Sequence, residues 1–268
     1  MGKIVFITGI SSGLGKQTAT YLAEKGYCVY GTSRRPIEHG TNIHLVEMDV
    51  TDPKSVQLAV NTVIQKEGHI DVLINNAGMG FSGSVEDTTY EEARYQLETN
   101  FFGQFHTIQA ILPFMRMQKS GTIINISSIV GIMGVPFQGL YSVSKFAIEG
   151  LSEVLRMELK EFNINVVLVN PGDFNTPFTA NRKIITKAGP TSPYYQQFDK
   201  TMKVIVKDET GGLSPTVLAK KIYSILQKKK PCPRYVVASA EQKLAVILKY
   251  ILPGGWFSKI LEGHYHIK

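Results

Sequence analysis

The feature that most constrains the fold is a glycine-rich turn directly after the first predicted strand. The apolar run from Lys3 to Ile7 is typical of a buried parallel strand, and a helical pattern continues through Lys25. In this order, free N–H groups and the helix dipole point at one place and form an anion site. The turn contains Gly9, Ser12, Gly13, Leu14 and Gly15, spaced Gly-x-x-x-Gly-x-Gly rather than Gly-x-Gly-x-x-Gly. A purely structural turn is the alternative, but the position after a first strand favours the phosphates of a dinucleotide.

The end of the second predicted strand indicates which dinucleotide binds. That strand runs from Tyr27 to Thr32 and ends in Ser33, Arg34 and Arg35. NAD sites often have an Asp or Glu here for the ribose 2′-hydroxyl, whereas an Arg accommodates a 2′-phosphate. Since no carboxylate stands at this strand end, we expect NADP(H), contacted by Ser33 and Arg34. Two solvated arginines in a loop are the alternative.

A tyrosine and a lysine one helical turn apart predict acid/base chemistry. Tyr141 and Lys145 share one face of a predicted helix, so a cation beside the phenol should favour the phenolate. Such a pair makes a general acid/base whose pKa is brought toward working pH. Ser128, which precedes Tyr141 in the chain, could hold a carbonyl oxygen for protonation. An exposed helix face with a solvated lysine is the alternative.

Further motifs occur in a fixed order along the chain. Asn75-Asn76-Ala77-Gly78 follows an apolar strand, Asn100 lies in a long helical stretch, and Asn170-Pro171-Gly172 leads to Thr176. Together with the glycine turn and the Tyr141/Lys145 pair, this order resembles the short-chain dehydrogenase/reductase family from residue 3 to about residue 176. The glycine spacing resembles its shorter-chain oxidoreductase branch, and the C-terminal region is more loosely similar to hydroxysteroid and retinol dehydrogenase-like members.

The resemblance implies a role for each matching residue. Tyr141 would be the acid/base, Lys145 would bind the nicotinamide ribose and lower the Tyr141 pKa, and Ser128 would orient the substrate oxygen. Asn100 would anchor a water that links Lys145 to solvent. The cofactor-binding residues would be Gly9, Ser12, Gly13, Leu14 and Gly15 at the phosphates, Asp49 and Val50 at the adenine, Asn76, Ala77 and Gly78 at its ribose, and Pro171, Gly172 and Thr176 towards the carboxamide. A helix kink at Asn100 and turn-forming roles for Asp49 and the asparagines are the structural alternatives.

The alternation of strands and helices predicts one α/β domain over residues 1–268. We expect a Rossmann-type doubly wound parallel sheet of about seven strands with helices on both faces. The predicted strands begin near residues 3, 27, 43, 70, 121, 164 and 234, and the predicted helices cover about 13–25, 53–67, 90–118, 139–161 and 215–228. The ligand crevice is expected at the carboxyl ends of the strands.

Two segments outside this pattern are expected to shape the substrate site. The segment of about 173–213 lacks a strong regular pattern and is interpreted as a substrate lid. Together with the stretches around Met79 and 133–137, it should line an apolar pocket. Its large apolar residues are Phe174, Phe178, Tyr194, Tyr195, Phe198 and Met202.

The C-terminal tail, about 240–268, is basic and amphipathic. Leu244, Ile247, Leu248 and Ile251 recur at helical spacing, and Trp256 follows a Pro-Gly-Gly break. A stripe of this kind with lysines can make a weak membrane-surface contact. It could equally pack on the core, cover the substrate cleft or form a subunit contact.

The net charge of +7 is unevenly placed. Residues 1–180 hold 13 Lys+Arg against 17 Asp+Glu, whereas residues 181–268 hold 16 against 5. Nucleic-acid binding is one interpretation of such asymmetry, but no nucleic-acid motif accompanies it, so we expect no nucleic acid.

The remaining composition bears on compartment and cofactors. The two cysteines suit a reducing cytoplasm, and no metal site is expected from the scattered histidines. A strand that begins at residue 3 argues against a signal peptide. No apolar run reaches the roughly 20 residues of a membrane span.

These features predict a cytoplasmic NADPH-dependent carbonyl reductase that transfers hydride to an apolar ketone or aldehyde. Tyr141 would be the general acid. The partners of the protein would be a small apolar carbonyl or alcohol substrate and further copies of the chain. We expect a homodimer or homotetramer, formed through the helices that carry Asn100 and Tyr141. An NAD-dependent alcohol or hydroxysteroid-type dehydrogenase, or a dinucleotide-sensing regulator without turnover, are the alternatives. The complete set of Ser128, Tyr141 and Lys145 argues against the regulator.

Overall fold

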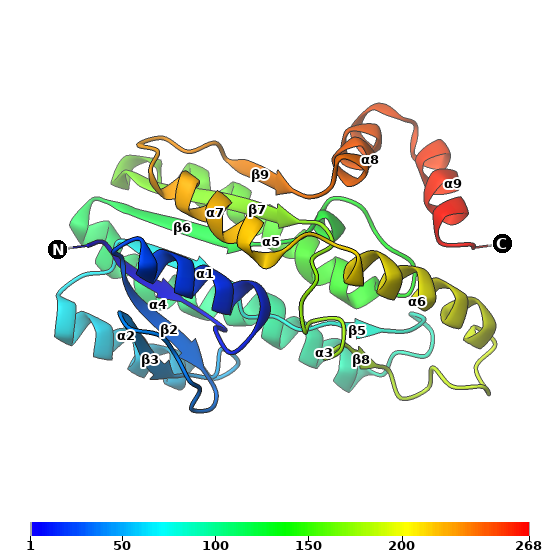
Figure 1. Ribbon diagram of the computed structural model, residues 1–268, viewed down its shortest axis with the longest axis horizontal. Helices are drawn as coiled ribbons and strands as arrows, with labels where there is room; N and C mark the ends of the chain where they lie inside the picture. The colour runs from blue at the N-terminus through cyan, green and yellow to red at the C-terminus, as the bar shows by residue number, and fades with distance from the viewer. Residues whose placement is uncertain (1, 268) are drawn as a thin grey trace.

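The computed structural model describes residues 2–267, and its centre is a parallel sheet of seven strands (Figure 1). In spatial order the strands are β3 (Ile43–Glu47), β2 (Cys28–Ser33), β1 (Ile4–Ile7), β4 (Val72–Asn75), β6 (Gly121–Ile126), β7 (Ile164–Pro171) and β9 (Arg234–Val237). The order reverses between β1 and β4, which is the switch point where ligands of doubly wound sheets bind. The predicted Rossmann-type α/β fold is therefore confirmed.

Helices cover both faces of this sheet, as its apolar pattern requires. Val5 and Ile7 of β1 belong to the core under α1 (Gly13–Glu24) and α7 (Pro215–Leu226). Ile4 and Phe6 belong to the core on the other face. That face is covered by α2 (Pro53–Glu67), α4 (Gly103–Gln118) and α5 (Gly139–Glu158). Because alternate side chains of a strand point to opposite faces, a strand buried on both sides must be apolar throughout.

The ends of α2 show how local sequence sets a helix boundary. The Asp52 side chain accepts a hydrogen bond from Lys54 N, and Pro53 occupies the first turn. At the other end Gly68 adopts φ 79, the left-handed conformation that glycine takes without a steric penalty. The predicted helix over 53–67 has the bounds that the structure gives.

The helices predicted over 90–118 and 139–161 differ most from the structure. The stretch predicted as one helix over 90–118 is α3 (Tyr90–Leu97), a π-helical segment, η1 (Glu98–Phe102), and α4. A π-turn inside a helix inserts an extra residue, which periodicity cannot reveal, and such turns occur frequently at functional sites. The helix predicted over 139–161 ends at Glu158 and is followed by a short 3-10 turn, η3 (Lys160–Phe162).

The predicted lid contains regular structure that its sequence pattern did not indicate. Helix α6 (Tyr195–Thr210) occupies much of it, and β8 (Lys183–Ile184) pairs in parallel with β5 (Phe81–Ser82). Phe198 and Ile205 of α6 are buried on its inner side. Lysines and acidic residues stand between these apolar positions, so the apolar periodicity of α6 is weak in the sequence and is recognised only from the buried face of the helix.

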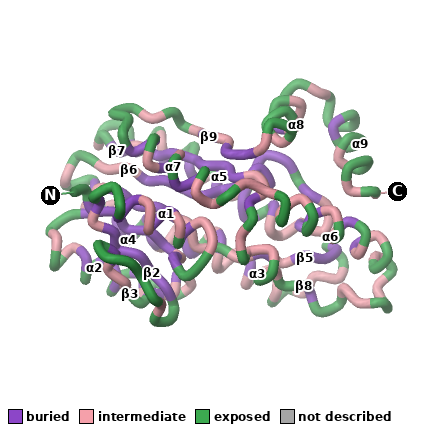
Figure 2. Tube along the Cα trace, viewed as in Figure 1, coloured by how far each residue is buried: buried purple, intermediate pink, exposed green. Residues whose placement is uncertain are grey.

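The tail forms two helices, α8 (Ala240–Ile251) and α9 (Gly254–His264). Their inner sides carry Val246 and Phe257, which join a third apolar cluster with Ile129 and Met133 next to a short turn, η2 (Ile129–Gly131). Their outer sides are largely exposed, as Figure 2 shows. Of the alternatives for the tail, packing on the rest of the domain is therefore observed. Within residues 2–267, none of the helices has both the length and the apolar character needed to cross a membrane.

Candidate active site

A cleft of about 760 Å³ lies along the carboxyl ends of the strands. At one end it is lined by the glycine turn and by the ends of β2 and β3. Its middle contains Ser128, Tyr141 and Lys145, and its far end is bounded by residues of the lid, α6 and α9. The cleft thus joins the predicted dinucleotide site to the predicted substrate site. The cofactor-site residues predicted from the sequence line it, as do Ser128, Tyr141 and Lys145.

The glycine turn has the shape that close approach of a phosphate requires. Gly9 and Gly13 have φ values of 73 and 56, where a side chain would be strained. A Cβ atom on Gly15 would collide with the Gly9 carbonyl oxygen and with the Asn76 side chain. Helix α1 begins at Gly13, and its N-cap residue Ser12 makes no side-chain capping bond. The N–H groups of the first turn therefore stay available for an anion, so the residues present fit a dinucleotide pyrophosphate.

Thr8, which the sequence patterns did not single out, fixes the loop after β4. Its hydroxyl oxygen accepts hydrogen bonds from the backbone N of Asn76 and of Ala77, both at 2.9 Å. The Asn76 side chain in turn donates to the carbonyl oxygens of Thr8 and Gly9 at 3.0 and 2.9 Å. Asn76 is thus more than a turn residue, because it joins the two loops that border the cleft. Thr8 could have been found as the polar residue that ends the first buried strand.

Ser33 and Arg34 lie at the end of the cleft where the 2′-position of the adenine ribose is expected. Both line the cleft together with Arg35; Ser33 is buried, whereas the two arginines are exposed. The Ser33 hydroxyl accepts from Arg35 N at 3.3 Å. Asp49 and Val50 line the same end, and the Asp49 side chain accepts from Thr51 N and Oγ1 at 2.9 and 2.8 Å. The turn-capping alternative for Asp49 is therefore observed alongside its position in the cleft.

Ser128, Tyr141 and Lys145 meet at the ends of β6 and α5. Ser128 is buried and lies beside the Tyr141 phenol, whose pKa it helps to lower. The Ser128 hydroxyl also donates to Pro171 O at 3.4 Å and accepts from Val130 N at 3.1 Å. The buried Lys145 ammonium donates to Ile126 O at 3.0 Å and lies 5.7 Å from the centre of the Tyr141 ring. The structure therefore brings the three predicted catalytic residues together, and the alternative of a solvated helix face is wrong.

Burial shifts the pKa of Tyr141 more than Lys145 does, so the expected lowering of that pKa by Lys145 stays a prediction. Burial raises the pKa of Tyr141 to about 12, and Ser128 lowers it only in part. Lys145 is directed at the Ile126 carbonyl rather than at the phenol, which explains why it does not dominate. Burial also lowers the pKa of Lys145 to about 8, and the nearby Glu149 carboxylate opposes that decrease. Tyr141 is therefore a protonated phenol at neutral pH.

Asn100 lies in the π-helical segment and is completely buried, at 0% exposure. Its side-chain oxygen accepts from Met79 N at 2.9 Å, and its Nδ2 donates to Met79 O and to Ser144 Oγ at 2.9 and 3.2 Å. These bonds fasten the loop after β4 to α5, close to Tyr141. The predicted water anchored by Asn100 stays a prediction, whereas the predicted kink coincides with the π-turn.

Comparison with known proteins agrees with this geometry. The family model for short chain dehydrogenases matches residues 3–184. A 3-ketodihydrosphingosine reductase of Bacteroides thetaiotaomicron is 46% identical over 99% of this chain and 99% of that protein. An NADPH-dependent 3-dehydrocapnine reductase of Ornithobacterium rhinotracheale is 32% identical over 95% and 94%. The crystal structure of a short-chain dehydrogenase from Streptomyces avermitilis matches with a TM-score of 0.83 and 27% identity over the whole of both chains.

The chain belongs to the short-chain dehydrogenase/reductase family. It is therefore an oxidoreductase that acts on CH–OH or C=O groups, with a nicotinamide dinucleotide as cofactor. In this short-chain dehydrogenase, Pro171, Gly172 and Thr176 also line the cleft, as expected for residues near the nicotinamide. Gly13 faces Thr176: a Cβ atom added to Gly13 would lie 3.5 Å from the Thr176 Cβ. The two predicted contact regions of the cofactor thus converge on one cleft.

The substrate end of this short-chain dehydrogenase is only partly the one expected. Phe174 and Phe178 line the cleft, and the Phe178 ring lies 5.8 Å from that of Tyr141. Phe198 packs instead against Phe137, and the Tyr194 hydroxyl donates to Glu86. Other apolar residues complete the wall: Met79, Ile129, Val130, Met133, Val135 and Leu261. An apolar wall is therefore present as expected, but it is only part of the lining, and α9 supplies some of it through Leu261.

Polar residues that the sequence patterns missed also border the substrate end. Asp173, Asp208, Glu209, Gln242 and Tyr265 line it. Gln242 Nε2 donates to the Asp173 carboxylate at 2.6 Å, and Glu209 is paired with Arg182. Burial, with Glu209 and Asp208 nearby, raises the pKa of Asp173 to about 6. Asp173 stands directly after the Asn-Pro-Gly motif, and that position was the available signal.

Proposed function

We propose that this chain is an NADPH-dependent carbonyl reductase for lipid-like ketones or aldehydes. We propose the keto form of a long-chain sphingoid base as its first substrate to test. The observation that carries the proposal is the convergence of Ser128, Tyr141 and Lys145 on a cleft whose outer part combines apolar side chains with a few polar ones. Ligand sites of this kind combine an apolar wall with a few polar groups that fix orientation.

The three catalytic residues divide the work on the carbonyl group. A bound reduced nicotinamide supplies a hydride to the carbonyl carbon. Ser128 holds the carbonyl oxygen by a hydrogen bond, and Tyr141 gives that oxygen its phenolic proton, so that an alcohol forms. Burial raises the pKa of Tyr141, so the phenol holds the proton that the carbonyl oxygen needs during reduction. The buried Lys145 cation stabilises the phenolate left behind, and a proton from solvent restores the phenol.

The proposed preference for NADPH rests on Arg34 and Arg35. Their guanidinium groups lie at the end of β2, and they line the cleft beside Ser33. A planar guanidinium suits a phosphate, whereas an NAD site often places a carboxylate at this strand end. The relative named for an NADPH-dependent reductase supports the same choice.

The proposed substrate class rests on the shape and charge of the far end of the cleft. An apolar wall suits an aliphatic chain, and the carboxylates of Asp173, Asp208 and Glu209 suit an amine on that chain. The keto form of dihydrosphingosine has both features, and the 46% identical relative is named for reducing it. The proposal gives the substrate a fixed direction, with its carbonyl at Tyr141.

The test is a cofactor-oxidation assay with purified protein, 3-ketodihydrosphingosine and either NADPH or NADH. We expect turnover with a marked preference for NADPH. Preference for NADH together with oxidation of the alcohol product would favour an NAD-dependent dehydrogenase. Binding of NADPH without turnover of this ketone, of decanal or of menadione would favour a dinucleotide-sensing regulator and refute the proposal.

We also propose that the outer side of α8 and α9 contacts a membrane surface where a lipid substrate resides. Large apolar side chains are exposed along it, with Lys243 and Lys259 among them. These residues are Leu244, Ile247, Ile251, Trp256 and Ile260, and we name them the outer stripe. The inner side of the same helices lines the cleft through Gln242 and Leu261, so a chain leaving the bilayer has a short path to the site.

A second copy of the chain is the partner we propose for α5. Val143, Phe146, Val154 and Met157 are exposed on this helix, and Phe102 is exposed on the neighbouring π-helical segment. An exposed apolar face of this kind is typical of an oligomer contact. Sedimentation of the purified protein should give a dimer or tetramer, and Met157→Glu should weaken it, while a monomer at micromolar concentration would refute the proposal.

A further inference from the structure

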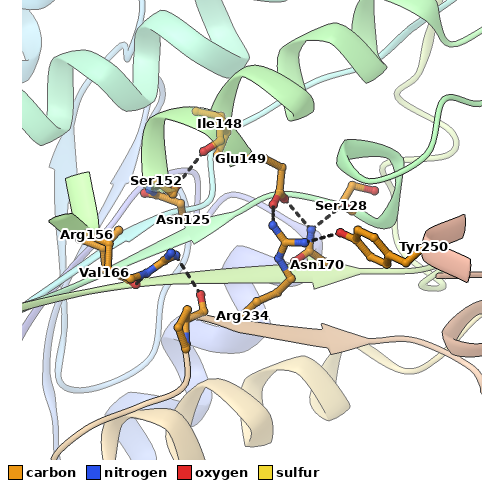
Figure 3. Close-up of polar contacts among 11 residues, drawn as sticks. Asn125, Ser128, Ile148, Glu149, Ser152, Arg156, Val166, Asn170, Arg234 and Tyr250 are labelled. Carbon is orange, nitrogen blue, oxygen red and sulfur yellow. Dashed lines mark hydrogen bonds and ion pairs between the residues drawn. The ribbon is translucent and has the colours of Figure 1, made fainter. Parts of the chain in front are cut away.

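A chain of hydrogen bonds connects the tail helix α8 with the backbone of the catalytic serine (Figure 3). Arg234 of β9 donates to the Tyr250 hydroxyl at 2.8 Å and to a Glu149 carboxylate oxygen at 2.5 Å. The other Glu149 oxygen accepts from Asn170 Nδ2 at 2.6 Å. Asn170 Nδ2 also donates to Ser128 O at 2.9 Å. Four elements, α8, β9, α5 and β7, are thus linked to the end of β6.

The orientation of the Asn170 amide is fixed by its two partners. Both the Ser128 carbonyl and the Glu149 carboxylate can only accept, so the amide must present its nitrogen to both. The amide oxygen is then left buried without a hydrogen-bond partner among the described residues. An unpaired buried oxygen costs stability, so the bonds made by the nitrogen have to outweigh that cost. Loss of the Glu149 acceptor would remove one of the two restraints on this side chain.

Asn170 lies where a small displacement reaches the reacting hydroxyl. It precedes Pro171, whose carbonyl accepts from Ser128 Oγ, so this segment holds Ser128 at both its carbonyl and its hydroxyl. Gly131 N donates to the same Ser128 carbonyl at 3.0 Å. The direction of the Ser128 hydroxyl therefore depends on the position of Asn170.

Glu149 is a charged residue in an otherwise closed position. It is 8% exposed and lies on the α5 face that carries Tyr141 and Lys145, one turn beyond Lys145. Burying a carboxylate is costly unless it is paired, and Arg234, whose side chain is 35% exposed, supplies the pairing charge. A neutral residue could fill this position without that cost, so the charge of Glu149 calls for a role that a neutral side chain cannot have.

We propose that Glu149 is a positioning residue of the active site, which holds Asn170, and through it Ser128, in the geometry for proton transfer. Arg234 fixes the Glu149 carboxylate from the outside, and Tyr250 fixes Arg234. The same carboxylate stabilises the Lys145 cation one turn away. The inference rests on the reductase activity proposed above but not on the identity of the substrate.

Glu149→Gln is the central variant, because glutamine keeps the size and one acceptor but cannot accept from both Asn170 and Arg234. The matched control is Glu153→Gln, one turn further along α5 at an exposed position. We expect kcat of Glu149→Gln to fall roughly tenfold or more, since misplacement of a reacting group by a fraction of an ångström is costly. The KM for NADPH should stay within about twofold of the control, because the cofactor contacts lie elsewhere in the cleft.

The pH profile of kcat tells whether Glu149 acts through its charge on the catalytic residues or only supports the local structure. The charged groups that face Tyr141 and Lys145 are Glu149 of α5, Asp173 after β7, Arg182 of the lid and Glu209 of α6, with Arg234 of β9 behind Glu149. Among residues 2–267, Glu149 is the charge that raises the pKa of Lys145, so neutralising Glu149 should lower that pKa further. The alkaline limb of the profile should therefore move to lower pH in Glu149→Gln and stay unchanged in Glu153→Gln.

Two further variants test residues farther from Ser128 in the same chain of hydrogen bonds. Arg234→Lys keeps the charge but loses the two guanidinium nitrogens that bind Glu149 and Tyr250, so its kcat should fall by a few-fold. Tyr250→Phe removes only the exposed partner of Arg234, so its kcat should fall least. If folded Glu149→Gln has the kcat and pH profile of Glu153→Gln, the inference is wrong. If Glu149→Gln does not fold, Arg234→Lys decides, and an unchanged kcat there overturns the inference. All variants are compared on 3-ketodihydrosphingosine or, if the wild-type protein does not reduce it, on decanal, so a wrong substrate and a wrong positioning role are told apart.

Discussion

The part of the chain that forms the cofactor site and the part that closes the substrate site are built on different principles. Residues 2–171 form six of the seven sheet strands, and the residues expected to contact the cofactor stand mostly in short motifs at the ends of these strands, where they line the cleft. Residues 172–267 contribute one edge strand and four helices, and line the cleft with side chains from distant positions. The charge differs too, because residues 1–180 have an acidic balance and residues 181–268 a strongly basic one. In this chain the expected chemistry and the lining of the substrate end are thus carried by different parts, which can be varied separately.

This contrast gives a rule for variants. Changes in the first part should affect every carbonyl substrate alike, whereas changes in the second part should depend on the substrate or on its lipid surroundings.

Tyr141→Phe should have the largest effect and be independent of substrate. Removing the proton donor should lower kcat by roughly a hundredfold to ten-thousandfold for 3-ketodihydrosphingosine and for decanal. NADPH binding, followed by its fluorescence, should be largely unchanged, because the ring remains. Residual turnover of one ketone near the wild-type rate would show that a residue of the second part can act as the acid.

Arg34→Ala should come next and should affect only one cofactor. Loss of a charge-assisted hydrogen bond of about 1.5–3 kcal/mol corresponds to roughly a tenfold to hundredfold rise in KM for NADPH. The KM for NADH should hardly change. Arg94→Ala, at an exposed arginine outside the cleft, is the control. An equal rise for both cofactors would mean that Arg34 does not contact the 2′-phosphate.

Trp256→Ala should weaken membrane contact without changing the chemistry. Burial of a large apolar side chain contributes about 1.5–3 kcal/mol, so binding to vesicles of phosphatidylglycerol and phosphatidylcholine should fall roughly tenfold. Activity on dissolved decanal should be unchanged. Tyr90→Ala, an equally exposed aromatic on α3, is the control in the same sedimentation assay. No binding of the wild-type protein to these vesicles would remove the outer stripe as a membrane contact.

Asp173→Asn should have the smallest effect and should change stability with pH. The Asp173 pKa is about 6 in the folded protein and 3.8 ordinarily, so between these values the folded protein holds a proton that the unfolded chain has released. The free energy of unfolding of the wild type should therefore decrease as the pH rises from about 4 to 6, because the carboxylate has to ionise in a buried place. Above pH 6 the full decrease is present. The variant should be more stable than the wild type by about 1 kcal/mol at pH 8, with the difference lost near pH 4, measured by urea unfolding.

The matched control for this prediction is Asp199→Asn, at an exposed position on α6 where the carboxylate is paired with Lys203. If Asp173→Asn is less stable than the wild type at pH 8, neighbouring groups stabilise the ionised Asp173 carboxylate, and the prediction that its charge destabilises the fold is wrong. The variant should also raise KM for an amine-bearing ketone more than for decanal, which extends the contrast between the two parts to function.

How far the sequence could predict each part has a physical reason. Strand ends and the glycine turn were predictable, because parallel strands need unbroken apolar runs and the turn needs φ values that glycine adopts. Ser128, Tyr141 and Lys145 were predictable as a set because spacing on a helix fixes which side chains meet. Helix α6 was missed, because its buried face is defined by partners far away in the chain.

The electrostatics of the site could not be predicted from adjacency. Tyr141 and Lys145 are close, but the pKa of the phenol depends on how deeply both are buried and on where the ammonium points. Glu149 likewise gains its importance from what surrounds it, since it belongs to no motif with a recognisable spacing, and Asp173 was marked only by its place after Asn-Pro-Gly. Thr8 shows the intermediate case, in which position was suggestive but the hydrogen-bonding partners came from another loop.

The place of β9 in the sheet has a consequence for synthesis on the ribosome. Strand β7 ends at Pro171, but the strand that pairs with its free edge begins only at Arg234. While the chain between them is being made, an apolar edge with unpaired amide and carbonyl groups stays open to other nascent chains. We therefore expect truncation before β9 to give aggregates, and slow translation of this stretch to increase the demand for chaperones.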